Sequence, residues 1–226
     1  MSKIKNVVLV HGAWADASSW SKVIPLLAAK SMKVTAVQLP LNSHEADVAT
    51  VRRAIELEDG PVVLVGHSYG GSVVTQAGNH AKVASLVYVD GFAPDAGESA
   101  GSIFAQFGSA PLNAEIRPDA EGFLKLSKVG IFEVFAQDLT DAEKSLLLTT
   151  QGPINGGALN GVVKEAAWRS KPTWYLIGDL DRAIPRVEQE RMATRMKATV
   201  AHADASHVAM LAQPEAVADH IFNAAS

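Results

Sequence analysis

Short apolar runs alternate along this chain with longer segments in which apolar residues recur at helical spacing. Six runs have this character: Val7–Val10, Lys33–Leu39, Val62–Val65, Leu86–Val89, Thr173–Ile177 and Thr199–Ala201. Most of them are apolar at consecutive positions, which is typical of strands buried on both faces of a parallel sheet. Parallel neighbours need long crossover connections, and helices usually supply them. The alternation therefore predicts an α/β protein with a doubly wound, mostly parallel sheet of about six strands.

The predicted helices lie between these runs, at Ser18–Lys30, Glu45–Glu58, Gly70–His80, Pro185–Arg195 and Pro214–Ala225. The alternation stops between Pro94 and Pro172, where glycine, proline and short helical patches dominate and no clear strand is visible. A stretch of that length is too long for a simple connection. We therefore expect a core made of residues 1–93 and 172–226, with a helical cap insertion of residues 94–171 over one end of the sheet.

Composition argues against several classes of protein. The net charge is −4, with 20 Lys and Arg against 24 Asp and Glu, so the basic stripe of a nucleic-acid-binding protein is not expected. The lack of cysteine excludes a thiolate nucleophile and a disulfide framework. The run Val7–Val10 is too short for a signal peptide, and no run approaches the ~20 apolar residues of a membrane span. We expect a cytoplasmic protein without a membrane partner, of unpredicted oligomeric state.

Two segments match the pattern G-x-S-x-G, in which a serine nucleophile lies on a sharp turn between a strand and a helix. The first is Gly66-His-Ser68-Tyr-Gly70, and the second is Gly97-Glu-Ser99-Ala-Gly101. Ser68 directly follows an apolar run and opens a predicted helix, whereas Ser99 has no predicted strand before it. The flanking glycines allow close backbone packing around a strained central residue. We therefore predict that Ser68, rather than Ser99, is a nucleophile.

A serine hydroxyl is a poor nucleophile until a base takes its proton, and histidine is the usual base. Of the seven histidines, His207 follows the last predicted strand, at the sheet edge where α/β sites form. His202 lies within that strand, where a structural role is expected. His11 and His67 lie near the site by position and are expected to shape the backbone. The remaining three are expected to be surface residues: His44, His80 and His220.

A carboxylate must hold that histidine in place, and three aspartates follow predicted strands. Asp179 and Asp181 follow the penultimate strand, and Asp90 closes the strand Leu86–Val89. Asp179 is also suited to form a turn or to cap the loop. Position alone therefore leaves three candidates for the acid.

Acyl transfer also requires two backbone N–H groups that stabilise a developing oxyanion. The residue after the nucleophile, Tyr69, is predicted to supply one of them. Ala13, in the loop after the first strand, is our candidate for the other, and Gly12 would let that loop approach closely. Gly12 and Trp14 are also candidate substrate-binding residues, although Trp14 is equally suited to the core. No set of metal ligands is predicted.

Four segments carry a resemblance to a known family: Val8-Leu-Val-His11-Gly-Ala-Trp14, Val65-Gly-His-Ser68-Tyr-Gly-Gly71, Asp181-Arg-Ala-Ile-Pro185 and Ala205-Ser-His207-Val-Ala-Met-Leu211. Together they resemble the α/β-hydrolase superfamily, and more narrowly its small branch of bacterial esterase-like proteins, plant methylesterases and hydroxynitrile lyases. The resemblance covers nearly the whole chain. It implies the α/β-hydrolase fold, a helical cap and no cofactor. It also implies that Asp181 is the acid of a triad in the order serine, acid, histidine, which favours Asp181 over Asp179.

The sequence departs from the lyases of this branch at two positions. Those lyases carry Thr directly after the strand-end His and Lys directly after the catalytic His, where this chain has Gly12 and Val208. The expected activity is therefore that of a serine esterase, which cleaves small carboxylic esters through an acyl-enzyme. Two alternatives stay open: a cofactor-free lyase or oxygenase with His207 as base, and a ligand-binding receptor that retains the triad.

Overall fold

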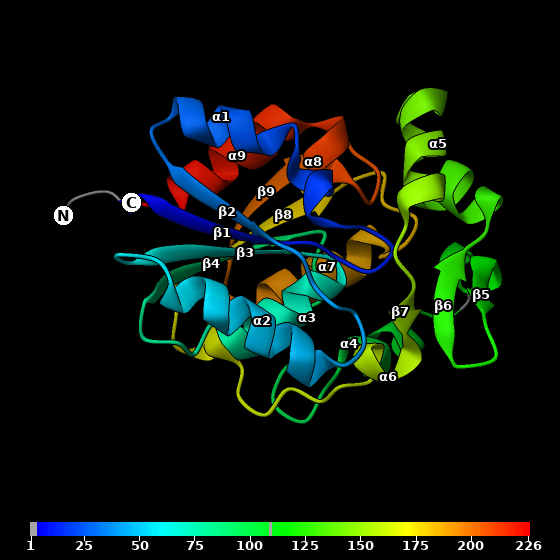
Figure 1. Ribbon diagram of the computed structural model, residues 1–226, viewed down its shortest axis with the longest axis horizontal. Coiled ribbons are helices and arrows are strands. Elements are labelled where there is room, and N and C mark those ends of the chain that lie inside the picture. Colours follow the sequence, from blue (N-terminus) through cyan, green and yellow to red (C-terminus); the bar gives the residue numbers. More distant parts are fainter. Residues whose placement is uncertain (1–3, 109) are drawn as a thin grey trace.

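A six-stranded parallel sheet forms the centre of the molecule in a computed structural model that describes residues 4–108 and 110–226. The strand order is β2-β1-β3-β4-β8-β9, and every neighbouring pair is parallel (Figure 1). The strands are β1 (Asn6–Val10), β2 (Lys33–Val37), β3 (Val62–His67), β4 (Val83–Val89), β8 (Thr173–Gly178) and β9 (Thr199–Ala203). The predicted doubly wound sheet of about six strands is confirmed.

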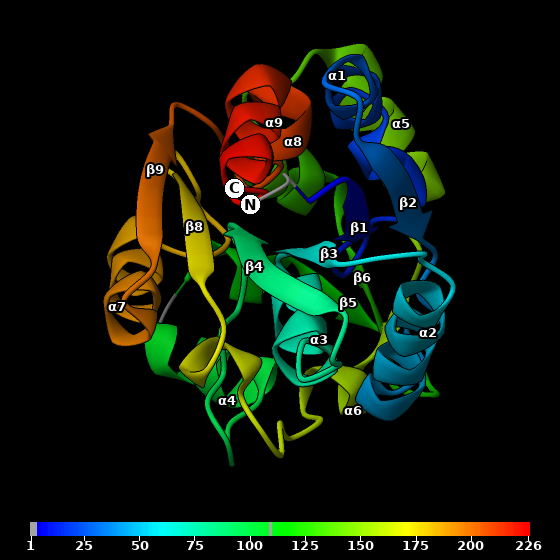
Figure 2. The same cartoon turned by 90° about the vertical axis from the view of Figure 1, so that its left-hand side faces the viewer.

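Helices cover both faces of this sheet (Figure 2). One face carries α1 (Val23–Ala29) and α9 (Pro214–Asn223), and the other carries α2 (His44–Glu56), α3 (Tyr69–Ala77) and α7 (Arg186–Met196). Burial from two sides explains why β1 and β3 are apolar at nearly every position and fully buried. Across residues 4–108 and 110–226, no helix is both long and apolar enough to cross a membrane.

The first helix is shorter than the predicted Ser18–Lys30. A 3₁₀ turn covers Ala17–Trp20, and α1 begins only at Val23. Pro25 explains the division, because proline lacks an N–H group and its ring clashes with the carbonyl four residues earlier in a helix interior. With the start at Val23, Pro25 lies in the first turn, where neither problem arises.

The prediction that residues 94–171 contain no strand is wrong. Three short strands in this region form an antiparallel sheet: β5 (Ile116–Pro118), β6 (Phe123–Leu126) and β7 (Ile154–Asn155). Helical elements make up much of the rest: α4 (Ala100–Phe104), a π-helical turn (Gly130–Phe135), α5 (Asp141–Thr150), α6 (Gly156–Leu159), and 3₁₀ turns at Ala105–Phe107, Pro111–Glu115 and Ala167–Arg169. Strands of two to four residues are too short to show an alternating pattern in the sequence. They form because they pair with residues that are distant in the chain, and a local pattern does not reveal such pairing.

This inserted segment lies beyond the carboxyl ends of the parallel strands (Figure 1). Trp14, in the loop after β1, donates from Nε1 to the carbonyl oxygen of Leu124 in β6 at 2.9 Å. At the outer edge, Lys22 forms an ion pair with Glu143 of α5 at 2.6 Å. The insertion therefore contacts the core at the edge of the sheet where residues that follow the strands gather.

Two histidines that were expected at the surface are buried instead, namely His44 and His220. On α9, His220 shares the inward face with Val217 and Ile221, at helical spacing, so the helix period places its ring against the core. Burial lowers the pKa of His220 from 6.5 to about 4, and its Nε2 atom has no hydrogen-bond partner among the described residues. The neutral ring is therefore the form that the fold stabilises.

We expect His220 to make the fold sensitive to acid. Its pKa is lower in the folded than in the unfolded chain, so its contribution is complete above about pH 6.5 and is lost as pH falls toward 4. At about 1.4 kcal/mol per pKa unit, the loss reaches at most about 3 kcal/mol. Urea unfolding at pH 7, 5.5 and 4 should show a shallower fall in stability for His220→Leu than for the wild type. Equal falls in both proteins would contradict this assignment.

Candidate active site

Ser68 occupies a strained turn between β3 and α3. Its φ is 51° and its ψ is −125°, a region that residues with a side chain rarely adopt. The carbonyl oxygen of Ser68 accepts hydrogen bonds from Gly71 N at 2.9 Å and from Phe92 N at 3.0 Å. These bonds, together with the packing of α3, hold the backbone in this conformation. The predicted turn from a strand into a helix is present at Ser68.

Two glycines let other backbone segments come close to this turn. A Cβ atom on Gly70 would lie 2.5 Å from the carbonyl oxygen of His11, and one on Gly12 would lie 2.6 Å from Cβ of Ser68. Both distances are far below ordinary van der Waals contact. The loop after β1 can therefore lie against Ser68 only because both positions lack a side chain.

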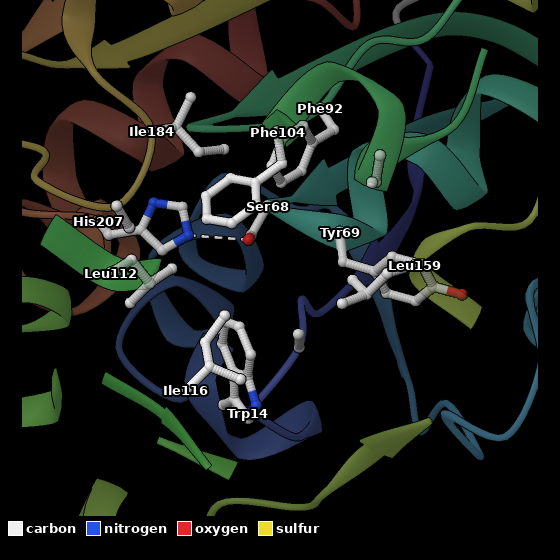
Figure 3. Close-up of a pocket in the computed structure, with 14 residues that line it drawn as sticks. Trp14, Ser68, Tyr69, Phe92, Phe104, Leu112, Ile116, Leu159, Ile184 and His207 are labelled. Carbon is white, nitrogen blue, oxygen red and sulfur yellow. Dashed lines mark hydrogen bonds between the residues drawn. The ribbon is translucent and has the colours of Figure 1, made fainter. Parts of the chain in front are cut away.

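Ser68, His207 and Asp181 form one chain of hydrogen bonds. Nε2 of His207 lies 2.8 Å from Oγ of Ser68 (Figure 3). Its Nδ1 atom lies 2.7 Å from Oδ2 of Asp181. The Asp181 carboxylate accepts the Nδ1–H proton, so Nε2 is free to accept the hydroxyl proton of Ser68. All three side chains are buried, with exposed fractions of 7% or less. The three residues come from the ends of three different strands, as the order along the chain suggested.

The remaining bonds of Asp181 fix its carboxylate. Oδ1 accepts from the backbone N–H groups of Ala183 and Ile184, at 2.7 and 3.0 Å. Oδ2 also accepts from Nε2 of Gln189 at 2.8 Å. Gln189 was not predicted, although the sequence contains a signal for it. It is a polar residue on the inward face of α7, which is otherwise lined by Met192, Ala193 and Met196.

The alternative residues do not join this chain of hydrogen bonds. Ser99 caps α4, where its side chain accepts from Ser102 N. Asp179 pairs instead with His202 at 2.9 Å and with Arg186 at 3.2 Å, on a more exposed part of the surface. Asp90 is fully buried, and its Oδ1 atom accepts from Gly178 N at 2.7 Å.

His11 fixes the orientation of the peptide that joins Gly12 to Ala13. Leu39 N donates to Nε2 of His11 at 2.9 Å, so the ring proton lies on Nδ1 and is donated to the carbonyl oxygen of Gly12 at 2.8 Å. In a trans peptide the N–H group points opposite to the carbonyl, so the Ala13 amide faces away from His11. Burial lowers the pKa of His11, which keeps this ring neutral.

The amides of Ala13 and Tyr69 are both available to a ligand. Neither N–H group donates to another protein atom within residues 4–108 and 110–226, and both residues line the same pocket. The side chain of Tyr69 is held elsewhere, since its hydroxyl donates to Oδ2 of Asp47 at 2.7 Å. Two free donors beside a serine hydroxyl form an arrangement that can hold an anionic oxygen.

Two further side chains hold the backbone around His207. Nε2 of His67 donates to the carbonyl oxygen of His207 at 2.7 Å, and Ser206 N donates to Oδ2 of Asp138 at 2.7 Å. Burial and the neighbouring His207 hold the pKa of His67 well below its usual value, so this ring stays neutral. The backbone-shaping role expected for His11 and His67 agrees with these contacts. Asp138 belongs to the insertion, and nothing in the sequence around it indicates this contact.

The pocket above Ser68 is lined almost entirely by apolar side chains (Figure 3). Its open mouth included, it contains about 470 Å³ of space free of protein atoms. Trp14 is both a lining residue and a member of the buried core, so the two expectations for it are compatible. The other large apolar lining residues are Phe92, Phe104, Leu112, Ile116, Leu159 and Ile184. In the part of the chain that the structure describes, no three His, Asp or Glu side chains are grouped to hold a metal ion.

The model of the alpha/beta hydrolase family matches residues 7–220. The chain belongs to this family. This hydrolase is 27% identical over 254 residues to methylesterase 1 of Arabidopsis thaliana, covering 98% of this chain and 96% of the relative. It is also 27% identical to alpha-hydroxynitrile lyase of the same plant, over 82% of each chain. A crystal structure of polyneuridine aldehyde esterase shares the fold, with a TM-score of 0.85 over 98% of this chain and 99% of that chain, at 20% identity.

A methyl group on Gly12 should disturb the site without altering any hydrogen-bonding side chain. In Gly12→Ala the new Cβ would meet Cβ of Ser68 at 2.6 Å, so the loop that carries the Ala13 amide must move away. We expect kcat on an activated aryl ester to fall by on the order of 10²-fold. Gly152→Ala is the control, because its Cβ would meet only Cδ1 of Leu41 at 3.8 Å. Equal kcat values for the two variants would disprove the prediction.

Proposed function

We propose that this alpha/beta hydrolase is a serine esterase that cleaves small carboxylic esters through an acyl-enzyme on Ser68. The observation that carries the proposal is the chain of hydrogen bonds from Ser68 through His207 to Asp181, at the base of an apolar pocket. The similarity to methylesterase 1 over nearly the whole chain supports ester hydrolysis.

Acylation begins when the Ser68 hydroxyl attacks the ester carbonyl carbon. The hydroxyl proton passes to Nε2 of His207 as the new Oγ–carbon bond forms. The carbonyl oxygen becomes negative and accepts hydrogen bonds from the amides of Ala13 and Tyr69. Asp181 stabilises the imidazolium that has formed, because its Oδ2 atom already accepts the Nδ1–H proton.

The tetrahedral intermediate then collapses, and the bond to the alcohol oxygen breaks. His207 returns its proton to this oxygen, and the alcohol leaves the pocket. Water repeats the sequence on the acyl-enzyme, giving its proton to His207 while its oxygen attacks the acyl carbon. The second tetrahedral intermediate collapses, the Oγ–carbon bond breaks, and His207 returns its proton to Oγ of Ser68, with the carboxylic acid as the second product.

The lining of the pocket limits the substrates that it accepts. Trp14, Phe92 and Ile184 come from the core, and Phe104 and Leu112 come from the insertion. Among the described residues that line the pocket, none is an Asp, Glu, Lys or Arg, so a charged acyl or alcohol group would be desolvated without a partner. We therefore propose small, uncharged esters as substrates, and residues 94–171 as a cap that takes part in selecting them.

The lyase alternative deserves a direct test, because one relative is an alpha-hydroxynitrile lyase. Departure of cyanide leaves negative charge that a nearby cation would stabilise. The residue after His207 is Val208, which is buried and apolar, and Gly12 leaves the approach to the Ala13 amide unobstructed. These two residues favour ester hydrolysis.

Ser68→Ala should lower kcat on an activated aryl ester by on the order of 10⁴–10⁶-fold, because the nucleophile is removed. Ser99→Ala is the matched control, since this serine caps α4, and it should change kcat by less than about tenfold. A fluorophosphonate adduct located by mass spectrometry should lie on Ser68 in the wild type. A dead Ser99→Ala variant, or an adduct on Ser99, would exclude the assignment.

Asp181→Asn should lower kcat by on the order of 10⁴-fold, because an amide in place of the carboxylate favours the wrong imidazole tautomer. This magnitude is the one known for the same substitution in a serine protease. Asp179→Asn removes a carboxylate two residues away that contacts His202 and Arg186, and it should have a far smaller effect. The opposite ranking of the two kcat values would make Asp179 the triad acid.

Activity on an ester and on a cyanohydrin separates the two reaction classes. We expect turnover of an activated aryl ester well above background and no appreciable release of cyanide from mandelonitrile at the same enzyme concentration. Formation of more than one equivalent of product per enzyme molecule would also count against a purely receptor-like role. Rapid cyanide release that is abolished in Ser68→Ala, without ester cleavage, would establish the lyase instead.

A further inference from the structure

A fourth buried side chain, Asp90, lies between the strands that bear the triad. It directly follows β4, which is flanked by β3 on one side and β8 on the other. Its exposed fraction is 0%, and its φ of 46° is in the left-handed region. Aspartate tolerates this conformation better than most residues. The backbone is therefore turned so that the carboxyl group remains inside the protein.

The carboxyl group of Asp90 joins the two loops that carry His207 and Asp181. Its Oδ1 atom accepts from Gly178 N at 2.7 Å, and the backbone N–H of Ala209 is close enough to stabilise a charge on the carboxylate. Gly178 is the last residue of β8, three residues before Asp181. Ala209 begins α8 (Ala209–Ala212), two residues after His207. One side chain thus contacts the backbone on both sides of the hydrogen bond between His207 and Asp181.

The backbone next to Asp90 is tied to the neighbouring strands as well. Asp90 N donates to the carbonyl oxygen of Leu176 at 3.1 Å, and Phe92 N donates to that of Ser68 at 3.0 Å. Between them, the carbonyl oxygen of Gly91 accepts from the hydroxyl of Tyr175 at 2.6 Å. Residues 90–92 are therefore bonded to the segment of Ser68 as well as to the loops of the other two triad members.

We propose that Asp90 is a positioning residue for the triad, whose carboxyl group sets the distance between His207 and Asp181 by holding Gly178 and Ala209 together. The proposal rests on the proposed esterase function, since it assigns Asp90 a role in the same reaction. Asp90 acts through the backbone and does not touch the reacting atoms. Its removal should therefore lower kcat more than it alters KM.

The surroundings of Asp90 favour its protonated form. Burial and the charge of Asp181 raise the pKa of Asp90 well above its usual range. The titratable groups that face it are Asp181 from the loop after β8, Asp138 from the insertion and Tyr175 from β8, and none of these three is a cation. Its Oδ2 atom has no hydrogen-bond partner among the described residues. A neutral carboxyl group whose Oδ1 atom accepts an amide proton can be replaced by asparagine, which keeps that acceptor oxygen.

Steady-state kinetics of two variants separate positioning from charge. In Asp90→Asn the Oδ1 acceptor remains, so kcat on an aryl ester should stay within about threefold of the wild type. In Asp90→Ala the acceptor is lost, and kcat should fall by on the order of 10²-fold with little change in KM. Glu58→Gln is the matched control, because Glu58 is a buried carboxylate before β3, at the opposite end of the sheet. Its kcat should be unchanged.

A proton NMR measurement tests the same point without substrate. The Nδ1–H proton of His207, which is bonded to Asp181, should give a downfield resonance in the wild type and in Asp90→Asn. In Asp90→Ala this resonance should shift or broaden while the far-UV circular dichroism stays native. If wild type cleaves no ester, the proposed function fails, whereas this spectrum still tests whether Asp90 positions His207.

The outcomes are decisive even if Asp90→Ala does not fold. A loss of kcat and of the resonance in Asp90→Asn would overturn the proposal, because the charge rather than the acceptor would then be required. Retention of both in Asp90→Asn supports it.

Unfolding free energies of Asp90→Asn and wild type at pH 5–8 supply the second measurement. A raised carboxyl pKa makes the wild type lose stability, relative to Asp90→Asn, as pH rises. Parallel curves would show that Asp90 is charged and would overturn the neutral-acceptor model.

Discussion

The strained backbone of Ser68 is the constraint on which the rest of the site depends. A residue held in this region of φ and ψ is disfavoured by about 1–3 kcal/mol, so its surroundings must determine its conformation. Here β1, α3 and the segment after β4 do so through close packing at Gly70 and the hydrogen bond from Phe92 N to the carbonyl of Ser68. The same packing brings the loop after β1 against the serine. The turn that presents the hydroxyl thus also determines where the Ala13 amide lies.

Near this turn, several hydrogen-bond donors converge on the carboxylate of Asp181. Asp181 accepts four hydrogen bonds, two at each carboxylate oxygen, so its carboxyl group is held in one orientation. Burial keeps His11 and His67 neutral, and each uses its single ring proton to hold a backbone carbonyl. His67 lies 5.0 Å from His207 between ring centroids, so a charge on it would oppose an imidazolium at His207. Neutrality of the inner histidines is therefore part of the electrostatics of the site.

The parts of the fold that could be predicted from sequence are those in which local pattern and tertiary burial agree. Strands buried on two faces are apolar throughout, and the G-x-S-x-G turn has to follow one of them, so the sheet and the turn at Ser68 were both predictable. Position in the sequence did not separate Asp181 from Asp179, because both follow β8 in the same loop. The turn of that loop directs Asp181 toward His207 and Asp179 toward His202. The strands of the insertion escaped prediction because they depend on distant partners, such as the Gln151 side chain, which bonds Leu126 at both N–H and carbonyl. His220 was misplaced because α9 was not assigned an inward face.

The insertion combines two tasks in different segments. Its pocket-lining residues lie within 100–104 and 112–116 and at Leu159, whereas its contacts to the loops of Asp181 and His207 come from residues 133–138. In that second segment, Gln137 donates to the carbonyl of Leu180, and the carbonyl of Glu133 accepts from Arg182, both beside Asp181. Asp138 holds the N–H of Ser206, beside His207. Because the wall of the pocket and the support of the triad are separate, side chains of the wall can change size without loosening His207 or Asp181. Substitutions in residues 133–138, in contrast, should change how the loops of Asp181 and His207 are held.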